Sequence, residues 1–193
     1  KINLKNDKKY FFYPAQFWAH KNHRYIVDFL KLLKKNDNQI YKVVCCGTRK
    51  SNVNYIEKII EKNNLTQDFI ILDFLTNDEV IQLYKNSFGI IMPTYVARST
   101  LPLYESFFFK KPVFYSNNIL DDKLYQYVIG FNSYHPEDLV DKLKSVENGE
   151  INLNKLTNSA FEYYKNSCSD EVFVGNYKKM IDEYDYLRNR WED

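Results

Sequence analysis

The fold of this chain is decided by the stretch Met92-Pro-Thr-Tyr-Val-Ala-Arg-Ser-Thr-Leu-Pro-Leu-Tyr-Glu-Ser-Phe-Phe-Phe-Lys-Lys-Pro-Val-Phe-Tyr-Ser116. It begins at the end of an apolar run, Phe88 to Met92, which is too short for a helix and is typical of a buried strand. It ends in a second short apolar run, Val113 to Ser116. Between the two runs we expect one short helix. Pro102 marks its start, because proline suits the first helical position. Lys110-Lys111-Pro112 ends it, because cations are favourable at the negative end of the helix dipole and proline cannot continue the turn.

The start of this helix lacks a good cap. Leu101 takes the capping position, and leucine has no side-chain oxygen to accept the free N–H groups. No Glu or Gln follows three residues after Thr100, so no capping box replaces it. Free N–H groups beside Arg98, Ser99 and Thr100 predict an anion site. The alternative is a helix start whose N–H groups are hydrated, with Glu105 complementing the helix dipole.

On both sides of this stretch, apolar runs alternate with amphipathic segments. Strands are expected over 10–14, 41–46, 69–72, 88–92, 113–116 and 128–131. Helices are expected over 22–34, around Ile56 to Ile60, after a capping box at Thr76 to Glu79, and from Pro136. The helix after the capping box is expected to turn Val80, Leu83 and Tyr84 inward. The alternation implies right-handed crossovers between parallel strands. We therefore predict an α/β fold: a Rossmann-like, doubly wound parallel sheet of about six strands with helices on both faces.

The two ends of the chain differ from this pattern. Residues 1–9 are polar and basic and indicate a linker, so that residues 10–193 form the domain. Past Gly149 only helices are expected, from about residue 155 and again after Ser169. The last helix places five apolar or aromatic side chains on one face: Phe173, Tyr177, Met180, Ile181 and Tyr184.

Composition excludes several classes of protein. A net charge of +2 and a pI near 8.3 are too mild to indicate a nucleic-acid partner. No apolar run approaches the eighteen or so residues that a membrane span needs, and no targeting signal follows the basic start. The chain has five glycines, and their spacing permits no dinucleotide fingerprint, no phosphate-binding Walker loop and no nucleophile elbow. Dehydrogenases, P-loop enzymes and the common hydrolases are therefore excluded.

The three cysteines indicate neither a disulfide nor a metal site. Cys45 and Cys46 are adjacent in an expected strand and point to opposite faces, so they cannot bridge each other. Cys168 stands alone, the chain has three histidines, and no Cys-x-x-Cys occurs. Buried, reduced thiols of a cytosolic protein account for the cysteines. We expect no metal and no other cofactor.

In a doubly wound sheet, functional residues gather in the loops at the carboxyl ends of the strands. These loops are expected at 14–22, 46–52, 73–77, 93–101 and 116–120. In the first of them, Lys21 lies directly before the helix that Asn22 is expected to cap. A helix start and an ammonium together favour an anion, although a lysine on a surface loop is more often simply solvated.

Two segments carry a family resemblance. Leu101-Pro-Leu-Tyr-Glu-Ser106 followed by Lys111-Pro-Val-Phe-Tyr-Ser-Asn117 resembles the donor-site signature of the family 4 retaining glycosyltransferases, which have the GT-B fold. Pro14-Ala-Gln-Phe-Trp-Ala-His-Lys-Asn-His23 is very similar to a segment of bacterial sugar transferases in that family. The resemblance covers roughly Tyr10 to Leu143. It corresponds to the carboxy-terminal, donor-binding half of a two-domain enzyme, whose acceptor half is absent.

The resemblance implies roles for individual residues. Backbone N–H groups near Thr100 and Leu101, together with Lys21, would hold the donor diphosphate, and Glu105 would accept hydrogen bonds from the ribose. Just after the third strand, we expect a wall for the nucleotide base, formed by Phe74, Leu75 and Thr76.

Two positions depart from the family pattern. The family has an arginine where this chain has Gln16, so one phosphate-binding cation is missing, and Arg98 or Arg49 is a candidate replacement. The family also has a glutamate where this chain has Ala97. Ala97 and Gln16 together leave an inactive relative open as an alternative, whereas Lys21 and Glu105 argue against it.

The resemblance implies transfer of a sugar from a nucleoside-diphosphate sugar to an acceptor hydroxyl, with retention at the anomeric carbon and without a metal. It suggests bacterial glycan or glycolipid assembly in the cytoplasm, with membrane contact only through the full-length protein at its inner face. The acceptor would be bound by the missing N-terminal domain, so this chain alone is expected to bind donor without transferring sugar. The alternatives are a nucleotide-binding or partner-binding module without chemistry, and a UDP-sugar epimerase on the same fold.

Overall fold

The computed structural model describes residues 9–36, 41–49, 52–96 and 101–191. In these residues six strands form one sheet in the order β3-β2-β1-β4-β5-β6, and every neighbouring pair is parallel. The strands are β1 (Lys9–Pro14), β2 (Tyr41–Cys46), β3 (Phe69–Leu72), β4 (Gly89–Met92), β5 (Val113–Ser116) and β6 (Ile129–Phe131). The prediction of a doubly wound parallel sheet is confirmed. β1 begins one residue earlier than expected, and β4 and β6 begin one residue later.

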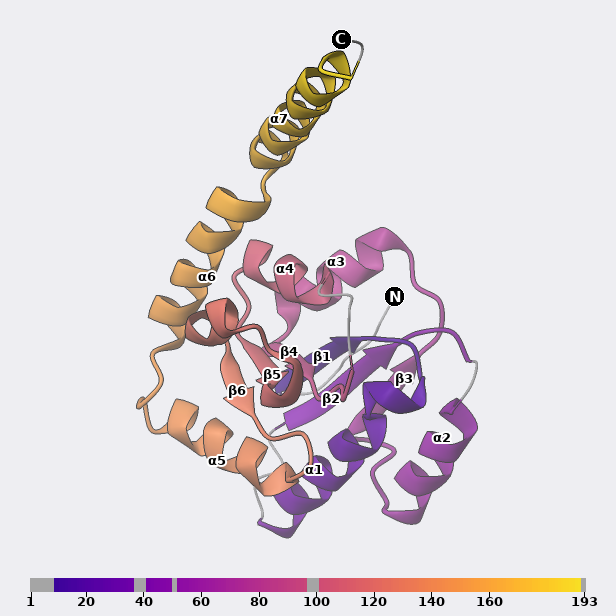
Figure 1. Ribbon diagram of the computed structural model, residues 1–193. Coiled ribbons are helices and arrows are strands. Elements are labelled where there is room, and N and C mark those ends of the chain that lie inside the picture. The colour runs from indigo at the N-terminus through magenta and orange to yellow at the C-terminus, as the bar shows by residue number, and fades with distance from the viewer. Residues whose placement is uncertain (1–8, 37–40, 50–51, 97–100, 192–193) are drawn as a thin grey trace.

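Helices cover both faces of the sheet. They are α1 (His23–Lys35), α2 (Val53–Lys62), α3 (Asn77–Asn86), α4 (Leu101–Phe108), α5 (Pro136–Glu147), α6 (Leu153–Cys168) and α7 (Asp170–Asn189), with short 3-10 turns η1 (Ala19–Lys21), η2 (Asn117–Ile119) and η3 (Asp122–Tyr127). Figure 1 shows α1, α2 and α5 on one face and α3 and α4 on the other. This arrangement follows from right-handed crossovers that leave the central strands in opposite directions.

The central strand β1 is buried on both faces. Phe11 points toward α1, where its ring meets Phe29 edge-on, and it also packs edge-on against Phe114 of β5 at 5.1 Å between ring centroids. The next residue, Phe12, points to the other face and meets Tyr84 of α3 at 5.1 Å, again edge-on. Both phenylalanines are fully buried. A strand whose successive side chains are all apolar is what a sheet covered on both faces requires.

The start of α3 follows the predicted capping box. The Glu79 N–H donates to the Thr76 hydroxyl at 3.4 Å, and the Thr76 N–H donates to the Glu79 carboxylate at 2.9 Å. Leu83 and Tyr84 are buried as expected, whereas Val80 is only half-buried. Proline also starts α5 at Pro136, as its sequence predicts.

Both ends of α4 differ in detail from the expectation. The helix begins at Leu101, with Pro102 in the second position; the preceding residue, where a cap would lie, is outside the described residues. Proline is tolerated there because the first-turn N–H groups have no partner inside the helix. The C-terminus ends in a left-handed residue, Lys110 (φ 51°), and the Lys111 N–H donates back to the Ser106 carbonyl at 2.9 Å. This is a Schellman turn, so backbone hydrogen bonds, not the cations, end the helix.

The lysine side chains after α4 have other partners. Lys111 reaches across to α3, where its ammonium donates to the Ser87 carbonyl at 2.9 Å. The Lys110 ammonium lies 4.5 Å from the ring centroid of Phe161 on α6. Both contacts join neighbouring helices, which is information that the local sequence does not contain.

The thiols are unbridged. Cys45 is buried, Cys46 and Cys168 are half-buried, and all three are free. Burial raises the pKa of Cys45, and it is the main cause that raises the pKa of Cys46 to about 11. Within the described parts of the chain, no group of three or more metal-ligating side chains could hold a metal ion. No helix in those same parts has the length and apolar character of a membrane span.

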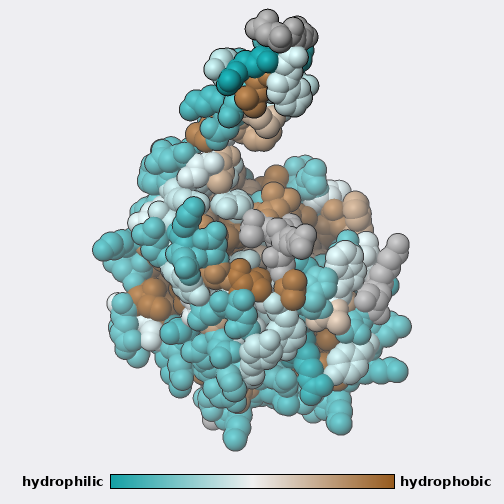
Figure 2. Space-filling view, viewed as in Figure 1, coloured by the Kyte–Doolittle hydropathy of each residue, from teal (hydrophilic) through white to brown (hydrophobic). Residues whose placement is uncertain are grey.

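The two C-terminal helices differ in how they are anchored. α6 packs on α4 and η3, and its Thr157 and Ala160 are buried. Ser169 caps the start of α7, because its hydroxyl accepts the Val172 N–H, and the helix extends away from the sheet (Figure 1). α7 has no buried residue. Its predicted apolar face is exposed, from 42% at Ile181 to 69% at Phe173. Figure 2 shows hydrophobic residues beside hydrophilic ones on this projecting helix.

We expect the backbone amides of α7 to exchange with solvent much faster than those of α1. A single helix without tertiary packing is marginal in water, whereas α1 buries seven residues in the core. Hydrogen exchange followed by mass spectrometry at low protein concentration measures both helices in one experiment. Strong protection of α7 in a monomer would contradict this expectation. Protection that grows with concentration would indicate that its exposed face is covered by a second copy.

Candidate functional site

The order of the strands places a crevice between β1 and β4. From β1 the chain moves outward through β2 to β3, and from β4 it moves the other way through β5 to β6. The segments that follow β1 and β4 therefore turn to opposite faces of the sheet and leave space at the carboxyl ends of these two strands. Open α/β sheets bind their ligands at this topological switch point.

The loop after β1 is held in a defined conformation. The Trp18 N–H donates to the Gln16 carbonyl at 2.8 Å, and the Tyr13 hydroxyl donates to the Lys21 carbonyl at 2.9 Å. Gly47, at the end of β2, packs directly against the loop: a Cβ there would lie 2.9 Å from the Ala15 carbonyl oxygen. Such a distance is too short for any side chain, so glycine allows this close approach.

A hollow of about 210 Å³ occupies the switch point. We call it the switch-point hollow, and it is lined by Tyr13, Pro14, Ala15, Gln16, Trp18, Lys21, Met92 and Pro102. These residues come from β1, the loop after β1, the end of β4 and the first turn of α4. The structure therefore brings together Gln16, Lys21 and the start of α4. Leu101, the first residue of α4, directly precedes the lining residue Pro102. Its own side chain is exposed and does not line the hollow.

In the described part of the chain, Lys21 has no carboxylate that compensates its charge. It lies in η1 and is half-buried, and this burial lowers the pKa of its ammonium from the ordinary 10.5. Among the described residues, no side chain forms an ion pair or hydrogen bond with that ammonium. A partly desolvated cation at a helix start is suited to bind an anion, which would offset the unfavourable effect of burial on its charge.

Glu105 lies in the second turn of α4, below the helix start. Its Oε2 accepts a hydrogen bond from the Tyr84 hydroxyl of α3 at 2.6 Å. After burial, the Glu105 charge is the second cause that raises the pKa of Cys46, the last residue of β2. The first turn of α4 contains no acidic residue. The alternative that Glu105 only complements the helix dipole therefore loses support.

The sequence did not predict the hydrogen bond between Tyr84 and Glu105. The apolar spacing of α3 placed Tyr84 inward, as the structure does, but it did not identify a partner for the hydroxyl. The signal was the residue type itself, because a buried tyrosine hydroxyl needs a hydrogen-bond partner. That partner lies 21 residues away in the sequence, on another helix.

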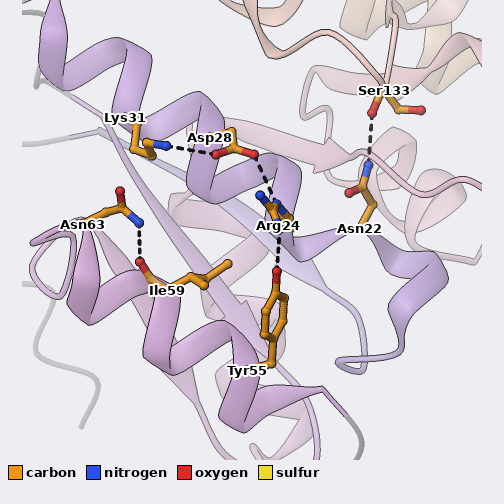
Figure 3. A network of polar contacts seen from close by, with 8 residues as sticks. All are labelled: Asn22, Arg24, Asp28, Lys31, Tyr55, Ile59, Asn63 and Ser133. Carbon is orange, nitrogen blue, oxygen red and sulfur yellow. Dashed lines mark hydrogen bonds and ion pairs between the residues drawn. The ribbon is translucent and has the colours of Figure 1, made fainter.

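The expected helix cap at Asn22 is wrong. Asn22 occupies the position before α1, but it is left-handed (φ 55°) and its side chain accepts no hydrogen bond from the helix. Its amide instead donates to the Pro93 carbonyl at 3.0 Å. The same amide donates to the Ser133 carbonyl at 3.1 Å (Figure 3). Asn22 is buried, and buried carbonyls need donors more than a solvated helix start needs a cap. Its function is to join the segments that follow β1, β4 and β6.

A second network lies on the outer surface of α1. Arg24 donates to the Tyr55 hydroxyl of α2 at 2.6 Å and forms an ion pair with Asp28 at 3.7 Å, and Asp28 also meets Lys31 at 3.3 Å (Figure 3). The Arg24–Tyr55 hydrogen bond joins α1 to α2, whereas the two ion pairs lie within α1. They are exposed and contribute little to stability.

Arg49, one candidate replacement for the missing family arginine, already has partners. Its guanidinium pairs with the carboxylates of both Glu57 and Asp73, and these two hydrogen bonds raise its pKa. Arg49 is not among the described residues that line the switch-point hollow. Arg98, the other candidate, lies outside the described residues, as do Ala97, Ser99 and Thr100.

The expected base wall follows β3 at the same edge of the sheet. Phe74 is 86% exposed, Leu75 is half-buried, and Thr76 forms the cap of α3. None of the three lines the switch-point hollow in the described part of the chain. Their contact with a nucleotide base therefore stays a prediction, and the large exposed ring of Phe74 is the feature that favours it.

Comparison with known proteins identifies the family. The model of the glycosyl transferases group 1 family matches residues 1–163. A glycosyltransferase from Rickettsia africae superposes with a TM-score of 0.81 at 18% identity over 94% of this chain and 49% of that chain. Sucrose-phosphate synthase from Thermosynechococcus elongatus gives 0.82 at 13% identity, over 96% of this chain and 47% of that chain.

A third similar structure contains a nucleotide. Anabaena HepE, solved in complex with UDP and glucose, superposes with a TM-score of 0.79 at 10% identity, over 92% of this chain and 49% of that chain. A comparison with curated protein sequences finds no match. This chain spans about half the length of the three similar proteins. From the family match and the shared architecture, we conclude that the chain belongs to the glycosyl transferases group 1 family and has the fold of the C-terminal, Rossmann-like half of a GT-B glycosyltransferase.

Proposed function

We propose that this chain is the donor-binding domain of a glycosyltransferase that takes a sugar from a nucleoside-diphosphate sugar. The observation that carries the proposal is the switch-point hollow, where Lys21 and the first turn of α4 meet in a chain of this family. The complex of HepE with UDP and glucose supports a nucleotide-sugar ligand for this fold.

In this proposal the chain binds the diphosphate, the ribose and the base of the donor through different residues. Lys21, the amide of Gln16 and the N–H groups at the start of α4 hold the diphosphate. Glu105 accepts hydrogen bonds from the ribose hydroxyls, and Phe74 to Thr76 contact the base. Because the diphosphate gains charge as the bond to the sugar breaks, fixed donors around it lower the barrier by electrostatic stabilisation.

The finer steps follow from the same proposal. The sugar is transferred to an acceptor hydroxyl with retention at the anomeric carbon, and no metal takes part. The acceptor is bound outside these 193 residues, which suits a chain half as long as its structural neighbours. The activity belongs to bacterial glycan or glycolipid assembly in the cytoplasm, at the inner face of the membrane.

Thermal unfolding of the chain in the presence of UDP, ADP and GDP tests the proposal. A ligand that binds only the folded state stabilises it by about 2.7 kcal/mol at a hundred times its dissociation constant. We expect at least one diphosphate to raise the melting temperature in a concentration-dependent way, and its monophosphate to do so less. Calorimetry then gives the affinity.

Two results would contradict the proposal. One is the absence of stabilisation by every nucleoside diphosphate at millimolar concentration. The other is equal stabilisation by inorganic pyrophosphate alone, since that would indicate a general anion site without nucleoside recognition. Sugar transfer by residues 1–193 without any other domain would contradict the assignment of the acceptor site elsewhere.

A further inference from the structure

The hydrogen bond between Tyr84 and Glu105 joins two helices on the same face of the sheet. Tyr84 lies in the last turns of α3, and Glu105 lies in the second turn of α4. The 2.6 Å distance between the hydroxyl oxygen and Oε2 is typical of an O–H donor to a carboxylate. The conformation of the Glu105 carboxylate, which is proposed to bind the ribose, therefore depends on a residue of another helix.

The Tyr84 ring cannot move freely. Its side chain is 1% exposed, it meets Phe12 of β1 edge-on at 5.1 Å, and it stacks on Phe109 at 5.3 Å with 19° between the rings. A ring packed on two sides has one position, so its hydroxyl presents a donor at one fixed point. Glutamate, in contrast, has a terminal torsion that is broad when no partner holds it.

The direction of this hydrogen bond is fixed. Burial and then the bond to Glu105 raise the pKa of the Tyr84 hydroxyl, so the hydroxyl keeps its proton and donates, and the Glu105 carboxylate accepts. The second oxygen, Oε1, has no hydrogen-bond partner among the residues that the structure describes. With Oε2 held, Oε1 has a defined direction from which it can accept a ligand hydroxyl.

We propose that Tyr84 is a positioning residue for ribose recognition: its hydroxyl fixes one oxygen of Glu105 so that the other is presented to the ribose hydroxyls of the nucleotide. The proposal rests on the proposed function, because it assumes that Glu105 accepts from a ribose. Fixing an acceptor before the ligand arrives raises affinity, because less side-chain freedom is lost on binding.

The test is a double-mutant cycle with two ligands. Tyr84→Phe keeps the packing on Phe12 and Phe109 and removes only the hydroxyl. Calorimetry measures the binding of UDP and of 2′,3′-dideoxy-UDP to the wild type, Tyr84→Phe, Glu105→Ala and the double variant. If ADP or GDP binds better than UDP, that nucleotide and its dideoxy analogue are used instead. We expect Tyr84→Phe to weaken UDP binding about three- to tenfold, the effect of one hydrogen bond. It should leave the dideoxy ligand unaffected.

The cycle separates positioning from a structural effect. If Tyr84 acts through Glu105, its removal should change UDP affinity little once Glu105 is already alanine, which cannot accept from the Tyr84 hydroxyl. Tyr10→Phe is the matched control, because the Tyr10 hydroxyl also donates to α3, to the Leu83 carbonyl at 2.9 Å, without touching Glu105. It should lower stability and leave UDP affinity unchanged.

Three results would overturn the proposal. They are unchanged UDP affinity in a folded Tyr84→Phe variant, equal losses for UDP and its dideoxy analogue, and an undiminished loss in the Glu105→Ala background. Failure of the proposed function has a different signature: the wild type then binds no nucleoside diphosphate, and this proposal falls with it. If the wild type binds and Glu105→Ala weakens binding while Tyr84→Phe does not, only the role of Tyr84 is rejected.

Discussion

Replacing Glu105 by glutamine is expected to weaken the binding of a nucleoside diphosphate about ten- to a hundredfold. The reason is that a ribose hydroxyl donates to a charged acceptor in the wild type and to a neutral one in the variant. Hydrogen bonds to charged groups contribute about 1.5–3 kcal/mol. Glutamine keeps the size of the side chain and an oxygen that can still accept from Tyr84, so the fold should be preserved. Calorimetry with UDP, ADP or GDP measures the loss.

The control for this variant removes the same charge elsewhere. Glu162 lies on the exposed surface of α6, where it pairs only with Lys165 among the described residues, so Glu162→Gln should leave nucleotide affinity unchanged. A 2′,3′-dideoxy nucleotide should bind the wild type weakly and be indifferent to Glu105→Gln. Unchanged affinity for the ribonucleotide in a folded Glu105→Gln variant would remove Glu105 from the proposed site.

Replacing Lys21 by alanine is expected to weaken diphosphate binding by a similar factor, about tenfold or more, because a charge-assisted contact is lost. This loss should be the same for ribonucleotides and dideoxynucleotides, which distinguishes it from the loss in Glu105→Gln. Stability without ligand should not fall, because burial already disfavours the charged ammonium in the folded protein. Lys31→Ala, on the exposed side of α1, is the matched control.

The pH dependence of binding provides a second test of Lys21. Burial lowers the pKa of its ammonium below the ordinary 10.5. The contribution of Lys21 to diphosphate affinity should therefore be complete at low pH and disappear as pH rises through that lowered pKa. It should disappear at a lower pH than an ordinary lysine would allow. Calorimetry at increasing alkaline pH should show this decrease in the wild type and not in Lys21→Ala. A decrease of equal size in both proteins would exclude Lys21 as its cause.

The prediction from sequence worked best where the signal is local. The apolar runs at 41–46 and 69–72 became β2 and β3 with the same bounds, because a short apolar run between polar segments has few other structures. The capping box at Thr76 and the proline at position 136 marked helix starts correctly, since each acts within one turn of its own helix.

The candidate site was predicted only in part. Topology brings the loop that contains Lys21 beside the start of α4, and this could be inferred because parallel strands present their carboxyl ends at one edge. The partners of single side chains could not be inferred. Asn22 has the residue type of a helix cap, yet it donates to carbonyls 71 and 111 residues away. Arg49 has the charge that the site needs, yet two carboxylates already hold it.

The sequence by itself determined the order of strands and helices, the doubly wound class and the loops in which a site could form. Periodicity and helix-terminal residues carry this information over a few positions along the chain. Only the tertiary structure decided that Tyr84 holds Glu105, that Asn22 joins the segments after β1, β4 and β6, and that the apolar face of α7 is exposed. The physical reason is that a buried polar group needs a hydrogen-bond partner and an apolar face needs another surface to pack against. In both cases the partner depends on which distant elements the packed sheet brings within a few ångströms.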